Sequence, residues 1–391
     1  MDLFKKCEDF DRVDILKEKD IYPYYIPLTS GQDTEVVMQN HRTIMIGSNN
    51  YLGLTSHPEV VEAGVEALKK YGSGCSGSRF LNGTLDIHID LENELAKFLH
   101  KEEVVTFSTG FQSNLGIISS ICGRNDVIVC DKENHASIYD ACKLSYAKME
   151  RFRHNDMEDL ERVLQGIDKN KGILIVTDGV FSMSGEICNL PKIVELAKKY
   201  GARVMVDDAH AFGVIGENGR GTASYFGLED DVDIIMGTFS KSLASLGGFV
   251  ATTKKVANFI KHTSRPFIFC ASIPPANVAC ARKALDIIER EPQRITRLQE
   301  IGDYVRDGLR KRNIKFIKSQ TPIVSIYIYD DEKAFIACRK LLNKGVYVNS
   351  VVSPAVPVGC ALLRTSYTAT HTNAQLDEAM DKIKEVLDEL L

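Results

Sequence analysis

The sequence lacks the features that mark secreted, membrane-spanning and nucleic-acid-binding proteins. Its first twenty residues are charged throughout, with no apolar segment of the kind found in a secretory signal peptide. No later stretch approaches the roughly 20 apolar residues that a membrane-spanning helix needs. There is no block of lysine and arginine, and a net charge of -5 gives no electrostatic reason to bind nucleic acid. We therefore expect a cytoplasmic protein with no membrane span and no nucleic-acid partner.

Paired cysteines are also missing. The chain has ten cysteines, but none of them forms a C-x-x-C pair of the kind that often supplies zinc ligands. In a reducing compartment, scattered cysteines usually act as small buried hydrophobic residues. The sequence therefore predicts neither disulfides nor a metal site.

What the chain does contain is ordinary for a globular enzyme. It has 391 residues, of which 44% are hydrophobic and 26% are charged. That length corresponds to two or three domains and is enough to bury a large core. It shows no internal repeat and no low-complexity segment.

Short apolar runs alternate with helical patterns from about residue 104 onward. This alternation is typical of βαβ units and therefore of a mostly parallel sheet. Continuous apolar runs indicate strands that are covered on both faces. The runs that we interpret as strands are residues 104–107, 127–130, 173–176, 204–206, 233–236 and 248–251. Polar or glycine-rich turns follow these runs, and we expect the turns to converge on one site, because ligands bind at this edge of such sheets.

The pattern changes after about residue 287. Helical spacing from Ile295 to Leu309 leads into an alternating segment at 323–329, then to short strands near 346–348 and 362–366 and a helix from Asn373. This order predicts a compact α+β domain. We divide the chain into an N-terminal arm (1–45), a large domain (46–286) and a small C-terminal domain (287–391).

A glycine-rich segment at residues 72–77, GSGCSG, matches the G-x-G-x-x-G pattern of dinucleotide sites. That fingerprint requires a strand before it and a helix after it. Here a helical pattern precedes the segment and a turn follows it. We therefore expect a loop that closes over a ligand rather than a nicotinamide site.

Residues 108–114, STGFQSN, follow a predicted strand and open a helix. Backbone N–H groups and the helix dipole at such a position suit a phosphate group. Many helices are capped by serine or threonine without binding any ligand. Both interpretations are open on this segment alone.

Charged side chains follow two other predicted strands. Lys241 lies among hydroxyl and small apolar residues, and a desolvated lysine has a lowered pKa that suits Schiff-base chemistry; a solvated surface lysine is the ordinary alternative. Asp207 could be a helix cap, a magnesium ligand or the partner of a protonated ring nitrogen. Pyridoxal phosphate enzymes pair an acid with that nitrogen and a lysine with the aldehyde. His135, after a third strand, could stack on a flat ring or be structural.

With these residues assembled, the chain resembles the α-oxoamine synthases, a family of fold-type I enzymes that use pyridoxal 5′-phosphate (PLP). The resemblance runs almost from end to end. Its motifs are residues 48–54, 77–84 with His88, 108–111, 131–137, 178–186, 206–210, 238–241, 271–275, and Arg364 with 369–372. It implies an α/β fold with a large, mostly parallel seven-stranded sheet domain and a smaller C-terminal α+β domain.

The resemblance also implies roles for individual residues. Lys241 would bind the cofactor aldehyde and act as the general base. Asp207 would pair with the pyridine nitrogen, His135 would stack on the ring, and His210 would contact its phenolic oxygen. Further cofactor contacts implied by the resemblance are Gly110, Phe111, Ser182, Thr238, Ser240 and Ser272, and implied substrate contacts are Asn49, Ser78 and Arg364.

Two of these implied roles bear on assembly and on substrate. Ser272 would reach the cofactor phosphate across a dimer interface, which implies a homodimer with shared active sites. Arg364 would bind the amino-acid carboxylate. The implied reaction is a decarboxylative Claisen condensation of a small amino acid with an acyl-CoA, giving an α-amino ketone, CoA and CO2.

Several longer runs, such as 154–160 and 351–357, most resemble the soluble homodimeric serine palmitoyltransferases of bacteria. We therefore favour L-serine with a long-chain acyl-CoA, a reaction of sphingolipid biosynthesis that forms 3-ketosphinganine. Two alternatives stay open, because residues 270–275 and 363–371 depart from the serine palmitoyltransferases at positions next to the pocket. They are glycine with acetyl-CoA (glycine C-acetyltransferase) and alanine with a pimeloyl thioester (8-amino-7-oxononanoate synthase). Ser78 disfavours glycine with succinyl-CoA, since 5-aminolevulinate synthases carry threonine there.

Two alternatives come from other functional classes. An aminotransferase on the same fold would use Lys241 and Asp207 equally well, but it would usually lack the 77–84 motif. A regulatory, non-enzymatic subunit typically loses the lysine, whereas this chain keeps Lys241, Asp207 and His135.

Overall fold

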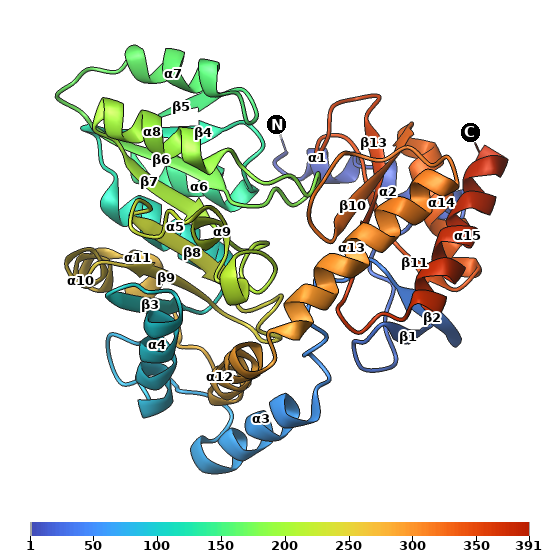
Figure 1. Ribbon diagram of the computed structural model, residues 1–391, viewed down its shortest axis with the longest axis horizontal. Helices are drawn as coiled ribbons and strands as arrows, with labels where there is room; N and C mark the ends of the chain where they lie inside the picture. The colour runs from blue at the N-terminus through green and yellow to red at the C-terminus, as the bar shows by residue number, and fades with distance from the viewer. Residues whose placement is uncertain (1, 391) are drawn as a thin grey trace.

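The computed structural model describes residues 2–390 and contains a large sheet-based unit beside a smaller one (Figure 1). The large sheet has the strand order β3-β9-β8-β7-β6-β4-β5, in which β9 runs antiparallel to both neighbours and the other pairs are parallel. Its strands are β3 (Glu103–Phe107), β4 (Asp126–Asp131), β5 (Lys148–Phe152), β6 (Gly172–Asp178), β7 (Arg203–Asp207), β8 (Ile234–Thr238) and β9 (Gly248–Thr252). The predicted fold class is confirmed.

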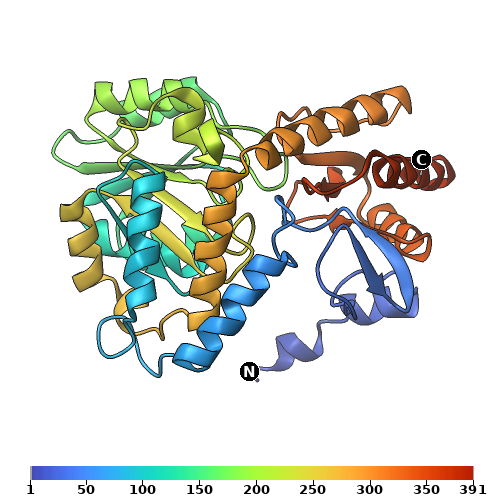
Figure 2. The same ribbon diagram turned by 60° about the horizontal axis from the view of Figure 1, so that its bottom comes forward.

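Helices cover both faces of this sheet, which explains its continuous apolar strands. Successive side chains of a strand point to opposite faces, so Ile175 of β6 packs into one core while its neighbours Leu174 and Val176 pack into another. The helices that contribute to the first core include α4 (Asp86–Phe98), α7 (Met157–Gln165), α8 (Leu190–Tyr200), α9 (Thr222–Phe226) and α12 (Pro275–Arg290). Those that contribute to the second are α5 (Gly110–Ile121), α6 (Ala136–Ser145), α10 (Lys254–Thr263) and α11 (Arg265–Ile268). The remaining helix, α3 (Pro58–Tyr71), packs along α12 (Figure 2), and a 3₁₀ turn spans Glu217–Gly219.

The smaller unit has its own core beneath an antiparallel sheet of order β10-β13-β12. Its elements are β10 (Ile323–Tyr329), α14 (Asp331–Asn343), β11 (Val346–Tyr347), β12 (Asn349–Val351), β13 (Ala361–Ser366) and α15 (Asn373–Leu390). Helix α13 (Gln293–Lys311) joins the two units: Ile295 and Leu298 are buried in the core of the large unit, and Ile301, Val305 and Leu309 in that of the small one. The predicted helical spacing is thus confirmed.

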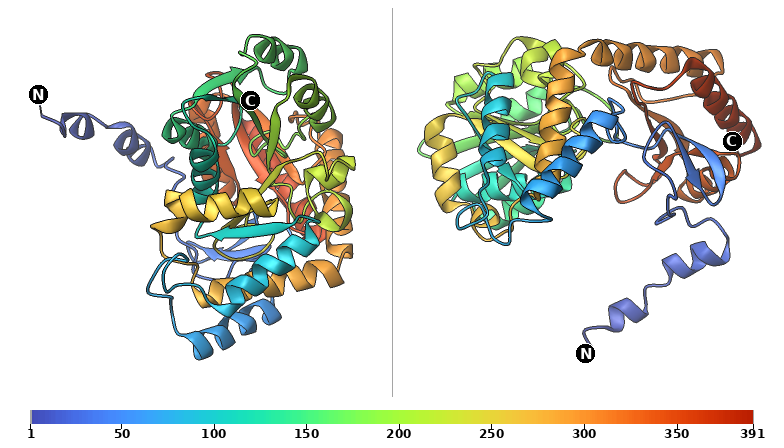
Figure 3. Two further views of the ribbon diagram at one scale, coloured as in Figure 1. Left: turned by 90° about the vertical axis from the view of Figure 1, so that its left-hand side faces the viewer. Right: turned by 90° about the horizontal axis from the view of Figure 1, so that it is seen from below.

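The N-terminal region contains α1 (Lys5–Glu8), α2 (Arg12–Glu18), β1 (Glu35–Met38) and β2 (His41–Met45). Strands β1 and β2 form a sheet with β11, so this part of the arm packs with the small unit. Helix α1 extends away from the body (Figure 3), whereas Leu16 of α2 is buried in the small-unit core. The predicted boundary at 286/287 falls inside α12, and the three-part division of the chain stays a prediction.

A helix that crosses a membrane must be both long and apolar. None of the helices within residues 2–390 combines the length and the apolar character that crossing a membrane requires.

Candidate active site

The carboxyl ends of β3, β4, β6, β7 and β8 surround a cavity of about 290 Å³. Parallel strands end at the same edge of a sheet, so the turns that follow them meet there. Eight of the predicted residues line this cavity, namely Gly110, Phe111, His135, Asp207, His210, Thr238, Ser240 and Lys241. The expectation that the turns converge on one site is therefore confirmed.

Lys241 follows β8 and is partly buried at this cavity. The pKa of Lys241 is lowered to about 8, mainly by burial. The charge of Arg364 lowers this pKa further, whereas the charge of Asp207 raises it. A lysine with this pKa is partly neutral near pH 7, and the neutral amine is the form that reacts with an aldehyde. Lys241 is thus the desolvated lysine that its sequence context suggests.

Asp207, the last residue of β7, is held by two donors. Its Oδ2 accepts a hydrogen bond from Asn114 Nδ2 at 2.7 Å, and its Oδ1 accepts one from the Ala209 N–H at 3.0 Å. Asn114 was not among the predicted site residues. It lies four residues after Gly110 on α5, so the helical period places both on the same side of that helix.

His135 caps α6, with its Nδ1 2.7 Å from the hydroxyl of Ser137. Its backbone N–H donates to Asp178 Oδ1 at 3.3 Å. Burial lowers the pKa of His135, and the charge of Lys241 contributes to this lowering, so a neutral imidazole faces the cavity. Burial raises the pKa of Asp178 well above its usual range, with the charge of Asp207 acting in the same direction. Asp178 lies in a recognised motif but had no predicted role.

The start of α5 and the end of β8 together offer a set of hydrogen-bond donors that suits an anion. The first N–H groups of a helix have no partner within it, and α5 begins at Gly110. A Cβ at Gly110 would lie 2.8 Å from Thr238 Oγ1, so only glycine allows this close approach. The hydroxyls of Thr238 and Ser240 lie 2.9 Å apart beside it.

This donor set fits PLP at three places. The start of α5 and the two hydroxyls suit its phosphate, Asp207 suits a protonated ring nitrogen, and the Lys241 amine suits its aldehyde. The neutral imidazole of His135 offers a flat surface on which the PLP ring could stack.

A second group of predicted residues adjoins this cavity. Arg364, on β13, is 5% exposed; its Nε donates to the Ser182 carbonyl at 2.5 Å and its Nη2 to Asn49 Oδ1 at 3.1 Å. The hydroxyl of Tyr51 lies 3.3 Å from Asn49 Oδ1 and 2.7 Å from His210 Nδ1. The charge of Arg364 lowers the pKa of both His210 and Lys241, after the larger effect of burial. Tyr51 thus links the two groups, a role that the 48–54 motif gave no means of predicting.

Five predicted residues do not line the cavity: Asn49 and Arg364, which belong to this second group, and Ser182, Ser272 and Ser78. Ser182 presents its carbonyl oxygen to Arg364. Ser272 donates its hydroxyl to the Gly77 carbonyl at 3.2 Å, and Ser78 forms an isolated bridge with Ala271. The 72–77 loop follows α3 rather than a strand, which confirms that it is not a dinucleotide fingerprint.

Known proteins with similar sequences and structures are identified by comparison with this chain. The family model for aminotransferase class I and II matches residues 42–383. A serine palmitoyltransferase of Sphingobacterium spiritivorum is 51% identical over 384 residues, covering 98% of this chain and 96% of that protein. An 8-amino-7-oxononanoate synthase of Bacillus subtilis is 44% identical over 375 residues, covering 96% of each. A solved structure of SPT with PLP internal aldimine has a TM-score of 0.97 and 37% identity, and the match covers 100% of this chain and 99% of that one.

Proposed function

The chain belongs to the aminotransferase class I and II family and, within it, to the PLP-dependent α-oxoamine synthases, and we propose that it condenses L-serine with a long-chain acyl-CoA. The products would be 3-ketosphinganine or a close homologue, CoA and CO2, which would place the reaction in sphingolipid biosynthesis. Support comes from relatives named serine palmitoyltransferase that are 51% and 46% identical over 98% and 97% of this chain. The second candidate is 8-amino-7-oxononanoate synthesis, favoured by the 44% identity to the Bacillus subtilis protein.

One observation carries the amino-acid part of this proposal. Arg364 is almost fully buried, yet within residues 2–390 no carboxylate lies within 4.0 Å of its guanidinium. A buried charge without a counter-ion is costly. The carboxylate of an amino acid, bound beside the Lys241 cavity, would complete the pair with the forked geometry that arginine offers.

When bound, PLP supplies an electron-withdrawing ring that stabilises negative charge at the α-carbon of an amino acid. Asp207, held by Asn114, would accept a hydrogen bond from the protonated ring nitrogen. Lys241 would hold the aldehyde and then accept the α-proton, for which a pKa of about 8 is well matched near neutral pH. Arg364 would fix the carboxylate and so orient the α-carbon toward that base.

We further propose a cytoplasmic homodimer with shared active sites. Ser78 and Ser272 lie outside the cavity of their own chain, and apolar side chains close to them in sequence are exposed: Phe80 by 50%, Leu81 by 75% and Phe269 by 78%. All ten cysteines are free, as in a reducing compartment. After cell fractionation, we expect the protein in the soluble fraction at the mass of two 43.5 kDa chains by light scattering. A monomer that turns over, or recovery with membranes alone, would contradict this.

The substrate proposal is tested by a matrix of amino acids and thioesters. Glycine, alanine and serine are each combined with acetyl-, pimeloyl-, succinyl- and palmitoyl-CoA, and free thiol is followed. We expect the highest kcat/KM for serine with palmitoyl-CoA, by about tenfold or more over alanine with pimeloyl-CoA, a typical discrimination for differences of this size in a binding pocket. The opposite order would favour the second candidate, and keto-acid production without thiol release would indicate an aminotransferase.

A further inference from the structure

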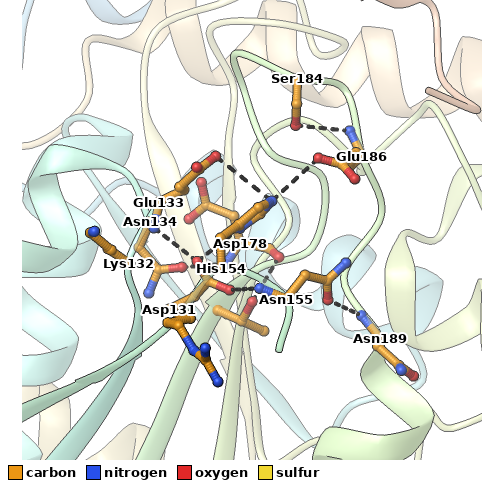
Figure 4. A network of polar contacts seen from close by, with 12 residues as sticks. Asp131, Lys132, Glu133, Asn134, His154, Asn155, Asp178, Ser184, Glu186 and Asn189 are labelled. Carbon is orange, nitrogen blue, oxygen red and sulfur yellow. Dashed lines mark hydrogen bonds and ion pairs between the residues drawn. The ribbon is translucent and has the colours of Figure 1, made fainter. Parts of the chain in front are cut away.

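A cluster of charged residues surrounds His154 (Figure 4). Neither His154 nor its carboxylate partners line the cavity. His154 follows β5, within the 154–160 run that the proposed function leaves without a role. Its Nδ1 lies 3.0 Å from Asp131 Oδ1, and its Nε2 lies 3.3 Å from Glu186 Oε2 and 3.7 Å from Glu133 Oε2. Three carboxylates from two different loops therefore face one imidazole.

The imidazole is the cation of this cluster. Burial opposes its protonation, but the hydrogen bonds to Asp131 and Glu186 and the charge of Glu133 outweigh burial and raise the pKa of His154 to about 10. The hydrogen bond from His154 correspondingly lowers the pKa of Glu186. Within residues 2–390 no set of three such side chains is arranged to hold a metal ion. His154 itself thus supplies the positive charge that the carboxylates need.

The first of the two loops, between β4 and α6, ends at the ring-stacking candidate His135. Asp131 is the last residue of β4, directly before this loop, and its Oδ2 also accepts a hydrogen bond from the Asn155 N–H at 2.7 Å. Asn134 anchors the loop to β6, since its side chain donates to the Val176 carbonyl at 2.8 Å and accepts from the Asp178 N–H at 3.0 Å. The loop therefore belongs to the rigid edge of the large sheet.

The second loop, between β6 and α8, reaches the small unit. The Ser182 carbonyl accepts a hydrogen bond from Arg364 Nε, the Met183 carbonyl accepts one from the hydroxyl of Ser325, and the Gly185 carbonyl accepts one from that of Thr321 at 2.9 Å. Glu186 follows directly. Only three residues separate it from Ser182, so a shift of the Glu186 side chain is transmitted through the backbone to the Ser182 carbonyl.

We propose that His154 is a positioning residue for the amino-acid substrate: it holds the 182–186 loop against the 131–135 loop, so that the Ser182 carbonyl keeps Arg364 oriented toward the cavity. This rests on the proposed role of Arg364 as the carboxylate ligand. Removing the cation leaves Asp131, Glu133 and Glu186 to repel one another. We expect this repulsion to move the 182–186 loop, because Asn134 anchors the 131–135 loop to β6. Most groups that fit PLP lie on α5, on β7 and at the end of β8, and they keep their places. His135 also keeps its place, because Asn134 anchors its loop to β6.

The test compares serine affinity with PLP affinity in His154→Phe holoenzyme. The dissociation constant for L-serine is obtained from the change in cofactor absorbance, without turnover, and PLP affinity is obtained by equilibrium dialysis. We expect serine binding to weaken by about tenfold, the effect of losing one hydrogen bond to a charged group, with PLP affinity within twofold of wild type. Glu186→Gln should weaken serine binding by about threefold. Glu195→Gln is the matched control and should change neither, because Glu195 is exposed and pairs with Lys192 on the surface of α8.

The outcomes separate this inference from the proposed function. If Arg364→Ala weakens serine binding and His154→Phe does not, the positioning role is wrong and the proposed function stands. If Arg364→Ala leaves serine binding unchanged, both fail. Equal losses of serine and PLP affinity in His154→Phe would indicate a general structural role and overturn the inference. Should His154→Phe not fold, Glu186→Gln decides: weaker serine binding supports the positioning role, and unchanged binding contradicts it.

Discussion

Replacing Lys241 with alanine is expected to reduce kcat by about 10⁴-fold, the upper end of what a positioned general base contributes. Lys241 is the amine at the cavity whose pKa is lowered to about 8, so it is suited both to bind the aldehyde of PLP and to accept a proton. Thiol release from acyl-CoA measures the loss. Borohydride treatment followed by peptide mass spectrometry should find PLP attached to Lys241 in the wild type and no such attachment in the variant.

A matched lysine change tests whether the effect is specific. Lys198 lies on α8, is largely exposed and pairs with Asp231 at the surface, so Lys198→Ala should keep kcat within twofold. The role of Lys241 is contradicted if the alanine variant turns over at a rate near that of the wild type. It is also contradicted if reduction attaches PLP to a different lysine.

The large sheet could be predicted because most of its strands are continuous apolar runs in the sequence. Each of the six predicted strands lies within or overlaps an observed one, since burial on both faces requires a continuous apolar run. The seventh, β5, has the sequence KMERF and pairs with β4 alone at the sheet edge. A strand with one open edge can carry charged residues. Its sequence therefore lacks the run that identifies the others.

The strands of the N-terminal arm could not be predicted from the sequence for a similar reason. Strands β1 and β2 are short, and the pairing of β2 with β11 joins Ile44 to Val346, which are far apart in the sequence. Local periodicity contains no information about such a partner. The burial of Ile44 and Ile46 in the small-unit core depends on it.

The site shows the same division between local and long-range information. Residues at the ends of predicted strands, such as Asp207 and Lys241, could be expected to meet because topology brings strand ends together. Asn114 and Tyr51 could not be singled out, because their roles come from single hydrogen bonds to Asp207 and His210. His154 belongs to this group as well, since its three carboxylate partners are distant in sequence.

Replacing Arg364 with alanine is expected to raise the dissociation constant for the amino acid by about 100-fold while PLP stays bound. Truncating one partner of a buried, hydrogen-bonded charge pair costs about 2–5 kcal/mol, and Arg364 is 5% exposed. The cofactor should be retained because its fitting groups lie on the large sheet and α5, whereas Arg364 lies on β13 of the small unit. Titration of the holoenzyme with L-serine, followed by cofactor absorbance, measures the change.

Two further arginine variants distinguish charge from geometry. Arg364→Lys keeps a positive charge but loses the planar fork that matches a carboxylate, so its serine affinity should fall between those of the wild type and the alanine variant. Arg310→Ala removes an exposed arginine that pairs with Asp307 on the surface of α13, and should leave serine binding unchanged. Unchanged serine affinity in Arg364→Ala would remove Arg364 from the substrate site. Because the Ser182 and Asn49 contacts already orient the guanidinium, we expect Arg364 to need little rearrangement to bind a carboxylate.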